Sequence, residues 1–276
     1  MTHRRPRQRL RPIAASLLCL SLPLWLAACA TSPTGRSQLQ LLSEPQLAEM
    51  GEQAYAQMRE QEQINTDPRV NRYVKCVADA IVEVVGPPAG GGSWDVTVFE
   101  NEAANAFALP GGNIGVFTGL LEVAQTQDQL AAVIGHEIGH VLASHSNERV
   151  SQQMVTQVGL DVVNQIAGGP GLGRQLGMAA LGLGAQVGVL LPYGRLQESE
   201  ADQIGQELMA RAGFDPSAAV DLWRNMQQAG GNAPPEFLST HPSGERRIQQ
   251  LQSLTSDSMT LYRQAQAQGR KPNCRR

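Results

Sequence analysis

The stretch that decides the fold is His136-Glu137-Ile138-Gly139-His140. On an α-helix, residues i and i+4 lie one turn apart on the same face, so both imidazoles can bind one metal ion. The carboxylate of Glu137 then lies beside the open coordination position, where the general base of a metal-assisted hydrolysis belongs. We therefore predict one zinc ion per chain on His136 and His140, with Glu137 as the catalytic base.

The surroundings of this motif favour a helix. Thr126 followed by Gln129 has the form of a capping box, and apolar residues keep a helical period from Leu130 to Leu142. The same motif also occurs in buried helices that bind no metal, so this context is needed. We predict a helix that begins at Thr126 and runs through the motif.

A catalytic zinc usually takes a third protein ligand, and an acidic stretch at residues 198–202 offers one. Glu198 and Glu200 are two residues apart in a helical pattern, so they point to different sides and at most one faces the metal. We predict Glu200 as the ligand and expect Asp202 to orient a ligating imidazole. Considered without the zinc helix, the same cluster is equally consistent with a solvated acidic face.

His145 is an alternative ligand that the spacing disfavours. It follows His140 by five residues and is rotated from it by about 140° on the helix. The chain also lacks the glycine-turned spacing that brings a third histidine to zinc in some proteases. We expect His145 to support a ligand from behind or to be structural.

Four sequence blocks resemble one known family: HEIGHVLASH at 136–145, ESEADQIG at 198–205, NAFALPGGNIGVFTGLL at 105–121 and THPSGERRI at 240–248. Together they resemble the CAAX-prenyl-protease-like zinc metallopeptidases, the HtpX-, BepA- and LoiP-like group. The resemblance implies an α+β, mainly helical gluzincin fold with zinc on His136, His140 and Glu200.

The resemblance also suggests where substrate binds. Val96 to Phe99 and Asn113 to Phe117 have strand patterns. In similar proteases the second strand is an exposed edge beside the active site, to which an extended peptide adds as a further strand. A plain hairpin covered by other elements is the alternative. The residues expected to bind substrate are Gly112, Asn113, Ile114 and Gly115.

His241 is similar to a histidine that lies near the zinc in this family. It is expected either to close the site as an extra ligand or to steady the oxyanion of the transition state. Either role needs a mobile segment, and Pro242 and the loop-rich stretch 230–235 are consistent with one. An ordinary loop histidine is the alternative.

The amino terminus has the form of a secretory signal that ends in a lipobox. An arginine-rich start precedes the uncharged run Ile13 to Ala28, whose 16 residues are fewer than the roughly 20 that span a bilayer. We predict a signal peptide over 1–28, a lipidated tether over 29–42 that begins at Cys29, and a peptidase domain over 43–276. Ala30 after the cysteine resembles an outer-membrane sorting signal, so we expect a periplasmic protein anchored by lipid to the outer membrane.

Charge and cysteine content narrow the function further. Removal of residues 1–28 takes away five arginines and no acid, which leaves 17 basic against 25 acidic residues and argues against nucleic-acid binding. Cys76 and Cys274 are the two cysteines left without another role, and in an oxidising periplasm they are candidates for a disulfide.

The remaining chain fits one domain. We expect helices from Ser43 to about Gln63 and from Asp67 through Val85. The uncharged segment Gln175 to Gly194 is either a flexible shield of the active site or a membrane-contacting segment.

The predicted function is endoproteolysis of misfolded or unassembled envelope proteins, with unfolded proteins as partners. One alternative is a chaperone-like factor that works with the outer-membrane assembly machinery and keeps its zinc site mostly closed. Another is a non-enzymatic lipoprotein with structural zinc, but structural sites are normally closed by four protein ligands.

Overall fold

The computed structural model describes residues 29–166, 191–229, 237, 241 and 245–276 of the 276-residue chain. The predicted signal peptide, residues 175–190 of the ambiguous segment, the stretch 230–235 and Pro242 lie outside the described residues. Among the helices that the structure describes, none is both long and apolar enough for a membrane span.

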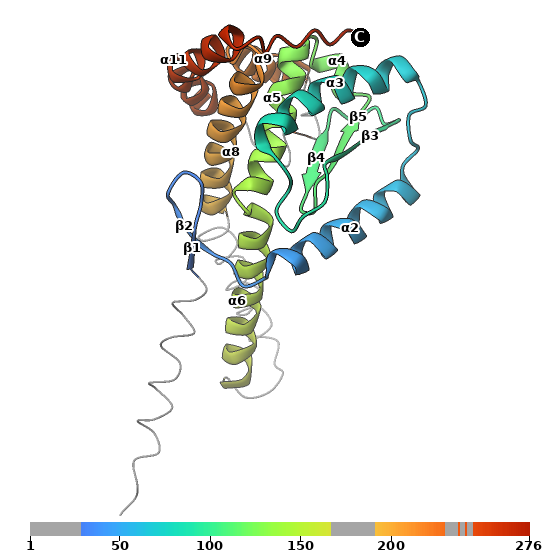
Figure 1. Cartoon of the computed structure of the whole chain (residues 1–276). Helices are drawn as coiled ribbons and strands as arrows, with labels where there is room; N and C mark the ends of the chain where they lie inside the picture. Colours follow the sequence, from blue (N-terminus) through green and yellow to red (C-terminus); the bar gives the residue numbers. More distant parts are fainter. Residues whose placement is uncertain (1–28, 167–190, 230–236, 238–240, 242–244) are drawn as a thin grey trace, which may run out of the picture.

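Helices surround a small sheet, and the zinc-motif helix runs through the centre of the molecule (Figure 1). The α+β, mainly helical class predicted from the sequence is confirmed. The elements named below are β1 (Cys29–Thr31), β2 (Ser37–Leu39), α2 (Glu44–Gln61), α3 (Pro68–Val85), β3 (Asp95–Phe99), β4 (Ala106–Leu109), β5 (Asn113–Phe117), α4 (Leu120–Val123), α5 (Gln127–Leu142), α6 (His145–Ile166), α8 (Leu191–Ala212), α9 (Ala218–Ala229) and α11 (Glu245–Ala267).

The helix starts follow the capping signals in the sequence. Ser43 and Gln46 form a capping box at the start of α2, and Asp67 accepts a hydrogen bond from the Arg69 amide at the start of α3. The Thr126 hydroxyl accepts from the Gln129 amide, so α5 begins where predicted. Helix α2 ends at residue 61, two residues before the expected end, and α3 has the predicted bounds.

The sheet has the order β3-β5-β4, with β3 parallel and β4 antiparallel to β5. All five residues of β5 are buried, and this central strand is paired on both sides. The expectation that Gly112, Asn113, Ile114 and Gly115 form a substrate-binding edge is therefore wrong. The edge strand that contacts α5 is β4, which the sequence analysis missed because Ala106 to Leu109 lacks β-branched residues.

The two faces of the sheet are buried against different partners. One face contributes Phe99 and Phe117 to a small aromatic cluster with Tyr55 of α2. The other face contributes Val98 and Val116 to the main core, which includes buried residues of α3, α5, α8 and α9. The central position of α5 thus depends on apolar burial from several sides.

The segment 29–42, which we expected to be a polar tether, is folded against the helical domain. Its strands β1 and β2 pair antiparallel, and the resulting hairpin docks on the helical domain. The Gln38 side-chain amide donates to the Ala143 carbonyl at 2.6 Å, and the Leu41 amide donates to the Ser151 hydroxyl at 2.9 Å. Polar residues therefore order this segment by hydrogen bonding to α6 and to the end of α5. Polar composition alone predicts contact with solvent, so it does not reveal this order.

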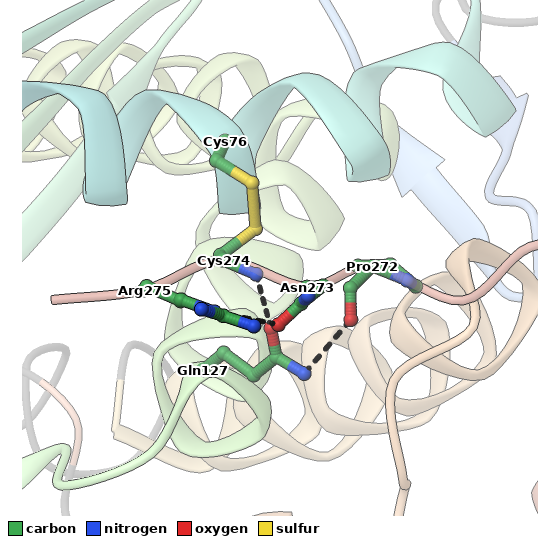
Figure 2. The surroundings of a disulfide bond; sticks show 6 residues. All are labelled: Cys76, Gln127, Pro272, Asn273, Cys274 and Arg275. Carbon is green, nitrogen blue, oxygen red and sulfur yellow. Dashed lines mark hydrogen bonds between the residues drawn. A yellow bond between two sulfur atoms is a disulfide. The ribbon is translucent and has the colours of Figure 1, made fainter.

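A disulfide between Cys76 and Cys274 joins α3 to the carboxyl-terminal tail (Figure 2). The tail also contacts the beginning of α5. The Gln127 side-chain amide donates to the Pro272 carbonyl at 3.0 Å, and the Cys274 amide donates to the Gln127 side-chain oxygen at 2.8 Å. The tail therefore fixes the amino-terminal end of the zinc-motif helix.

Candidate metal centre

Close packing of α5 against α8 brings the two halves of the site together. A Cβ atom added to Gly139 would lie 2.9 Å from the Ala201 carbonyl oxygen, and one added to Gly205 would lie 2.6 Å from the His136 amide nitrogen. Only glycine permits such an approach of two helix backbones. This approach places the acidic side chains of α8 within reach of the imidazoles of α5.

Four buried side chains converge at this helix contact: His136, His140, Glu198 and His241. The Nε2 atoms of His136 and His140 are 3.1 Å apart, and each lies 3.3 Å from a different oxygen of Glu198. The Nδ1 atom of His241 lies 3.2 Å from His136 Nε2 and 2.9 Å from Glu198 Oε2. One donor atom from each residue lies within 4.8 Å of the others.

Glu198, not Glu200, stands at the imidazoles, which corrects the expected third ligand. Glu200 lies on the other side of α8, where Thr34 and Arg36 of the hairpin donate to it and His145 Nε2 lies 3.1 Å away. The reason is helical geometry. Glu198 and Asp202 are four residues apart and share a face, whereas Glu200 and Asp202 cannot both face one site.

The donor set fits zinc. Imidazole nitrogens and carboxylate oxygens are its usual ligands, and tetrahedral bonds of about 2.0–2.2 Å place neighbouring donors about 3.3–3.6 Å apart. The two Nε2 atoms are 3.1 Å apart, and each lies 3.3 Å from one of the two Glu198 oxygens. The chemistry and the spacing of these three residues thus agree with one zinc ion.

A carboxylate and a buried arginine support His136. His136 Nδ1 lies 3.0 Å from Asp202 Oδ1, so Nδ1 carries the proton toward Asp202 and Nε2 faces the cluster. Arg247 donates to both oxygens of Asp202 at 2.7 Å, and its guanidinium lies 3.6 Å from the Trp223 ring centroid. We name the set His136, Asp202 and Arg247 the carboxylate relay.

Burial and hydrogen bonding act on the titration of these groups. Burial alone lowers the pKa of His136, but the carboxylates of Asp202 and Glu198 outweigh it and raise the pKa to about 9. Burial opposes ionisation of Glu198, yet hydrogen bonds from His136, His140 and His241 hold the pKa of Glu198 far below its usual range. A metal ion therefore competes with a proton for the ring of His136.

His145 contacts the other motif histidine. Its Nδ1 atom lies 2.8 Å from His140 Nδ1, and its ring is fully buried. The structure thus places His145 behind His140, on the side opposite Nε2. Burial lowers the pKa of His145 to about 4 despite the neighbouring Glu200, so this imidazole is neutral near pH 7.

Glu137 and His241 lie next to each other beside the two ligating imidazoles. Among the described residues, Glu137 Oε1 is a buried oxygen with no hydrogen-bond partner, and His241 Nε2 lies 3.5 Å from it. The His241 ring stacks on Phe237 with centroids 4.5 Å apart, and the His241 amide donates to the Phe237 carbonyl. A buried carboxylate oxygen without a donor is suited to accept a proton.

Glu198 was passed over as the ligand and Arg247 was given no predicted role, although the sequence holds a signal for each. The i, i+4 spacing of Glu198 and Asp202 indicates a shared helix face. Arg247 lies in the quoted block 240–248, and the predicted acidic cluster calls for a buried cation to neutralise it.

Comparisons with known proteins agree with this geometry. The sequence profile of Peptidase family M48 matches residues 68–255. The mitochondrial metalloendopeptidase OMA1 of Arabidopsis thaliana is 34% identical over 230 residues, which cover 82% of this chain and 45% of that protein. The beta-barrel assembly-enhancing protease of Escherichia coli is 30% identical over 247 residues, which cover 86% of this chain and 49% of that protein.

The chain thus spans about half the length of the curated relatives that it matches. The resemblance to the HtpX- and BepA-like proteases, drawn from four sequence blocks, is confirmed by the profile match and by these relatives.

Proposed function

This chain belongs to peptidase family M48, a family of zinc metallopeptidases, and from that premise we propose that it cleaves misfolded or unassembled proteins of the cell envelope. The observation that carries the proposal is the buried cluster of His136, His140 and Glu198, beside which Glu137 Oε1 accepts no hydrogen bond from any described residue. A relative of this chain is named a metalloendopeptidase, which supports cleavage within the substrate chain rather than at its ends.

The roles of the residues follow from their positions. His136, His140 and Glu198 would hold the ion, and zinc in such a site supplies a Lewis acid that activates water near neutral pH. Glu137 takes the proton of the attacking water on Oε1 and returns it to the leaving amine. The relay through Asp202 keeps a lone pair of His136 on the metal side.

Strand β4 is the proposed substrate-binding edge. The Asn105 carbonyl accepts from the Phe117 amide of β5, and in an antiparallel ladder the alternate residues Ala106 and Ala108 then turn their backbone groups outward. The Ala106 amide is already bonded to the Asn105 side chain, which leaves the Ala108 amide for an added strand. Ala108→Pro removes that donor and should raise KM for an unfolded protein substrate, measured beside its thermal unfolding.

The envelope location is supported by two observations. The sequence of residues 1–29 has the form of a lipoprotein signal, and an Escherichia coli relative is named a beta-barrel assembly-enhancing protease. We propose a periplasmic lipoprotein, anchored by Cys29 to the outer membrane. Relatives that are named mitochondrial belong to the same family, so the family alone does not assign the compartment.

A second candidate function is a chaperone-like assembly factor with a conditionally active site. The position of His241 favours it, because Nδ1 lies close enough to His136 and Glu198 to join the ligands and to leave no position for water. If His241 closes the site, His241→Ala should raise the rate of casein cleavage. A fall in that rate would assign His241 to the oxyanion instead.

Glu137→Gln tests the proposed function. The variant should bind one zinc ion per chain but lose at least about 100-fold in the rate of cleavage of an unfolded protein, because the amide cannot accept the proton. Glu122→Gln makes the same substitution on an exposed glutamate and serves as the matched control. Full activity of Glu137→Gln, or protein without stoichiometric zinc after folding is verified, would overturn the proposal.

A further inference from the structure

The amino-terminal hairpin inserts a half-buried arginine, Arg36, behind the metal cluster. The two terminal nitrogens of Arg36 donate to both oxygens of Glu148 on α6 at 2.6 and 2.8 Å. Its Nε donates to Glu200 on α8 at 3.0 Å, and its side chain is 19% exposed. Such bidentate bonds fix a guanidinium in orientation as well as in position.

The Glu200 carboxylate connects the Arg36 guanidinium to His145. Its two oxygens accept from Thr34 and Arg36, so the carboxylate acts as an acceptor toward His145 Nε2, 3.1 Å away. An Nε2 that donates leaves a lone pair on Nδ1 of a neutral imidazole. His145 Nδ1 is then a hydrogen-bond acceptor, and its donor is the protonated Nδ1 of His140, 2.8 Å away.

This hydrogen bond also determines which nitrogen of His140 is free to bind the metal. A proton on Nδ1 places the lone pair of His140 on Nε2, the atom that lies beside Glu198 and His136. The opposite tautomer would point an N–H at the metal position and could not ligate. We name His140, His145, Glu200 and Arg36 the hairpin relay.

We propose that Arg36 is a positioning residue of the metal centre, which acts through Glu200 and His145 to hold His140 in its ligating orientation. The proposal rests on the proposed role of His140 as a zinc ligand. Arg36 lies outside residues 68–255, the part of the chain that matches the family profile. The support for one family ligand therefore comes from a segment beyond the matched region.

The experiment measures zinc affinity by competition with a chromogenic chelator, on the mature chain with its disulfide intact. Arg36→Ala and His145→Ala should each weaken zinc binding by about 10-fold, the lower end of the usual cost of losing a group that orients a ligand. Because both changes break one relay, the double variant should bind no more weakly than His145→Ala alone. Arg36→Lys should restore part of the affinity.

Gln38→Ala is the matched control. It removes another anchor of the same hairpin, the bond to the Ala143 carbonyl, without touching the relay, and should leave zinc affinity unchanged. Losses of affinity that multiply in the double variant, or an equal loss in Gln38→Ala, would overturn the proposal and assign the effect to packing of the hairpin.

His140→Ala separates this inference from the proposed function. If His140→Ala abolishes zinc binding while Arg36→Ala binds like the unaltered protein, the relay fails and the proposed ligands stand. If His140→Ala keeps full zinc affinity, the ligand assignment itself fails.

Discussion

The carboxylate relay and the hairpin relay support neighbouring ligands in different ways. His136 rests directly on Asp202, whose charge is balanced by Arg247 inside the core. His140 contacts the imidazole of His145, and the charged groups of Glu200 and Arg36 lie beyond that imidazole. The first relay lies within the region that matches the family profile, whereas the second ends outside it.

The two relays therefore affect their imidazoles in different ways. A carboxylate in direct contact raises the basicity of the ligating imidazole as well as orienting it. A neutral imidazole in contact chiefly fixes the tautomer, since the nearest charge is separated by the width of a ring. We therefore expect the carboxylate relay to have the larger effect on both the free energy of unfolding and the affinity for zinc.

The largest expected effect is that of Arg247→Met on the free energy of unfolding. The change leaves Asp202 and Glu198 buried without their cation, and removal of one partner from a buried ion pair costs about 3–5 kcal/mol. Arg36→Met should cost about 1–3 kcal/mol, because Arg36 is nearer the surface. Urea unfolding of the metal-free proteins measures both, and a reversed order would break the comparison.

The next effect concerns zinc affinity. Asp202→Asn keeps the shape of the side chain but removes the charge that His136 contacts, and should weaken zinc binding by about 10-fold to 100-fold. Glu200→Gln makes the corresponding change behind His145 and should weaken it less. The two zinc dissociation constants, measured at one pH, test this order. Equal losses of affinity would show that the distance of the carboxylate from the ligand does not matter.

The smallest expected effect is the loss, at acid pH, of the stability that the Glu200 carboxylate contributes. Burial alone raises the pKa of Glu200, but bonds from Ser32, Thr34, His145 and Arg36 lower it from 4.5 to about 2. A lowered pKa stabilises the folded state above the unfolded value near 4.5, and this stabilisation is lost as pH falls from about 4.5 to 2. The stability difference between the metal-free unaltered protein and Glu200→Gln should thus shrink across this window in urea titrations, and a constant difference would contradict it.

The elements of the fold with strong local signals were predictable from the sequence. Capping residues and apolar periods place α2, α3 and α5 to within two residues. Strand β4 was not predicted because Ala106 to Leu109 has no β-branched residue, although its pairing with β5 is local in sequence. The amino-terminal hairpin was missed for a different reason, since its order comes from long-range bonds such as Gln38 to Ala143 that local sequence does not encode.

The residues of the candidate site likewise fall into those that local sequence predicts and those that it does not. The motif at 136–140 specifies two imidazoles and a base through helical spacing alone. The choice between Glu198 and Glu200 depends on which face of α8 meets α5, and the glycines that set this contact act across two helices. The arginines of both relays come from distant segments, so only the assembled fold identifies them.

The bond between Cys76 and Cys274 has a consequence for the order of events during biosynthesis. Residue 274 must have left the ribosome, and entered a compartment that oxidises thiols, before the tail can clamp Gln127 at the start of α5. A growing polypeptide thus carries the complete motif of a protease but lacks this clamp. If the chain is exported as proposed, full competence is accordingly expected only once Cys274 has been oxidised onto Cys76.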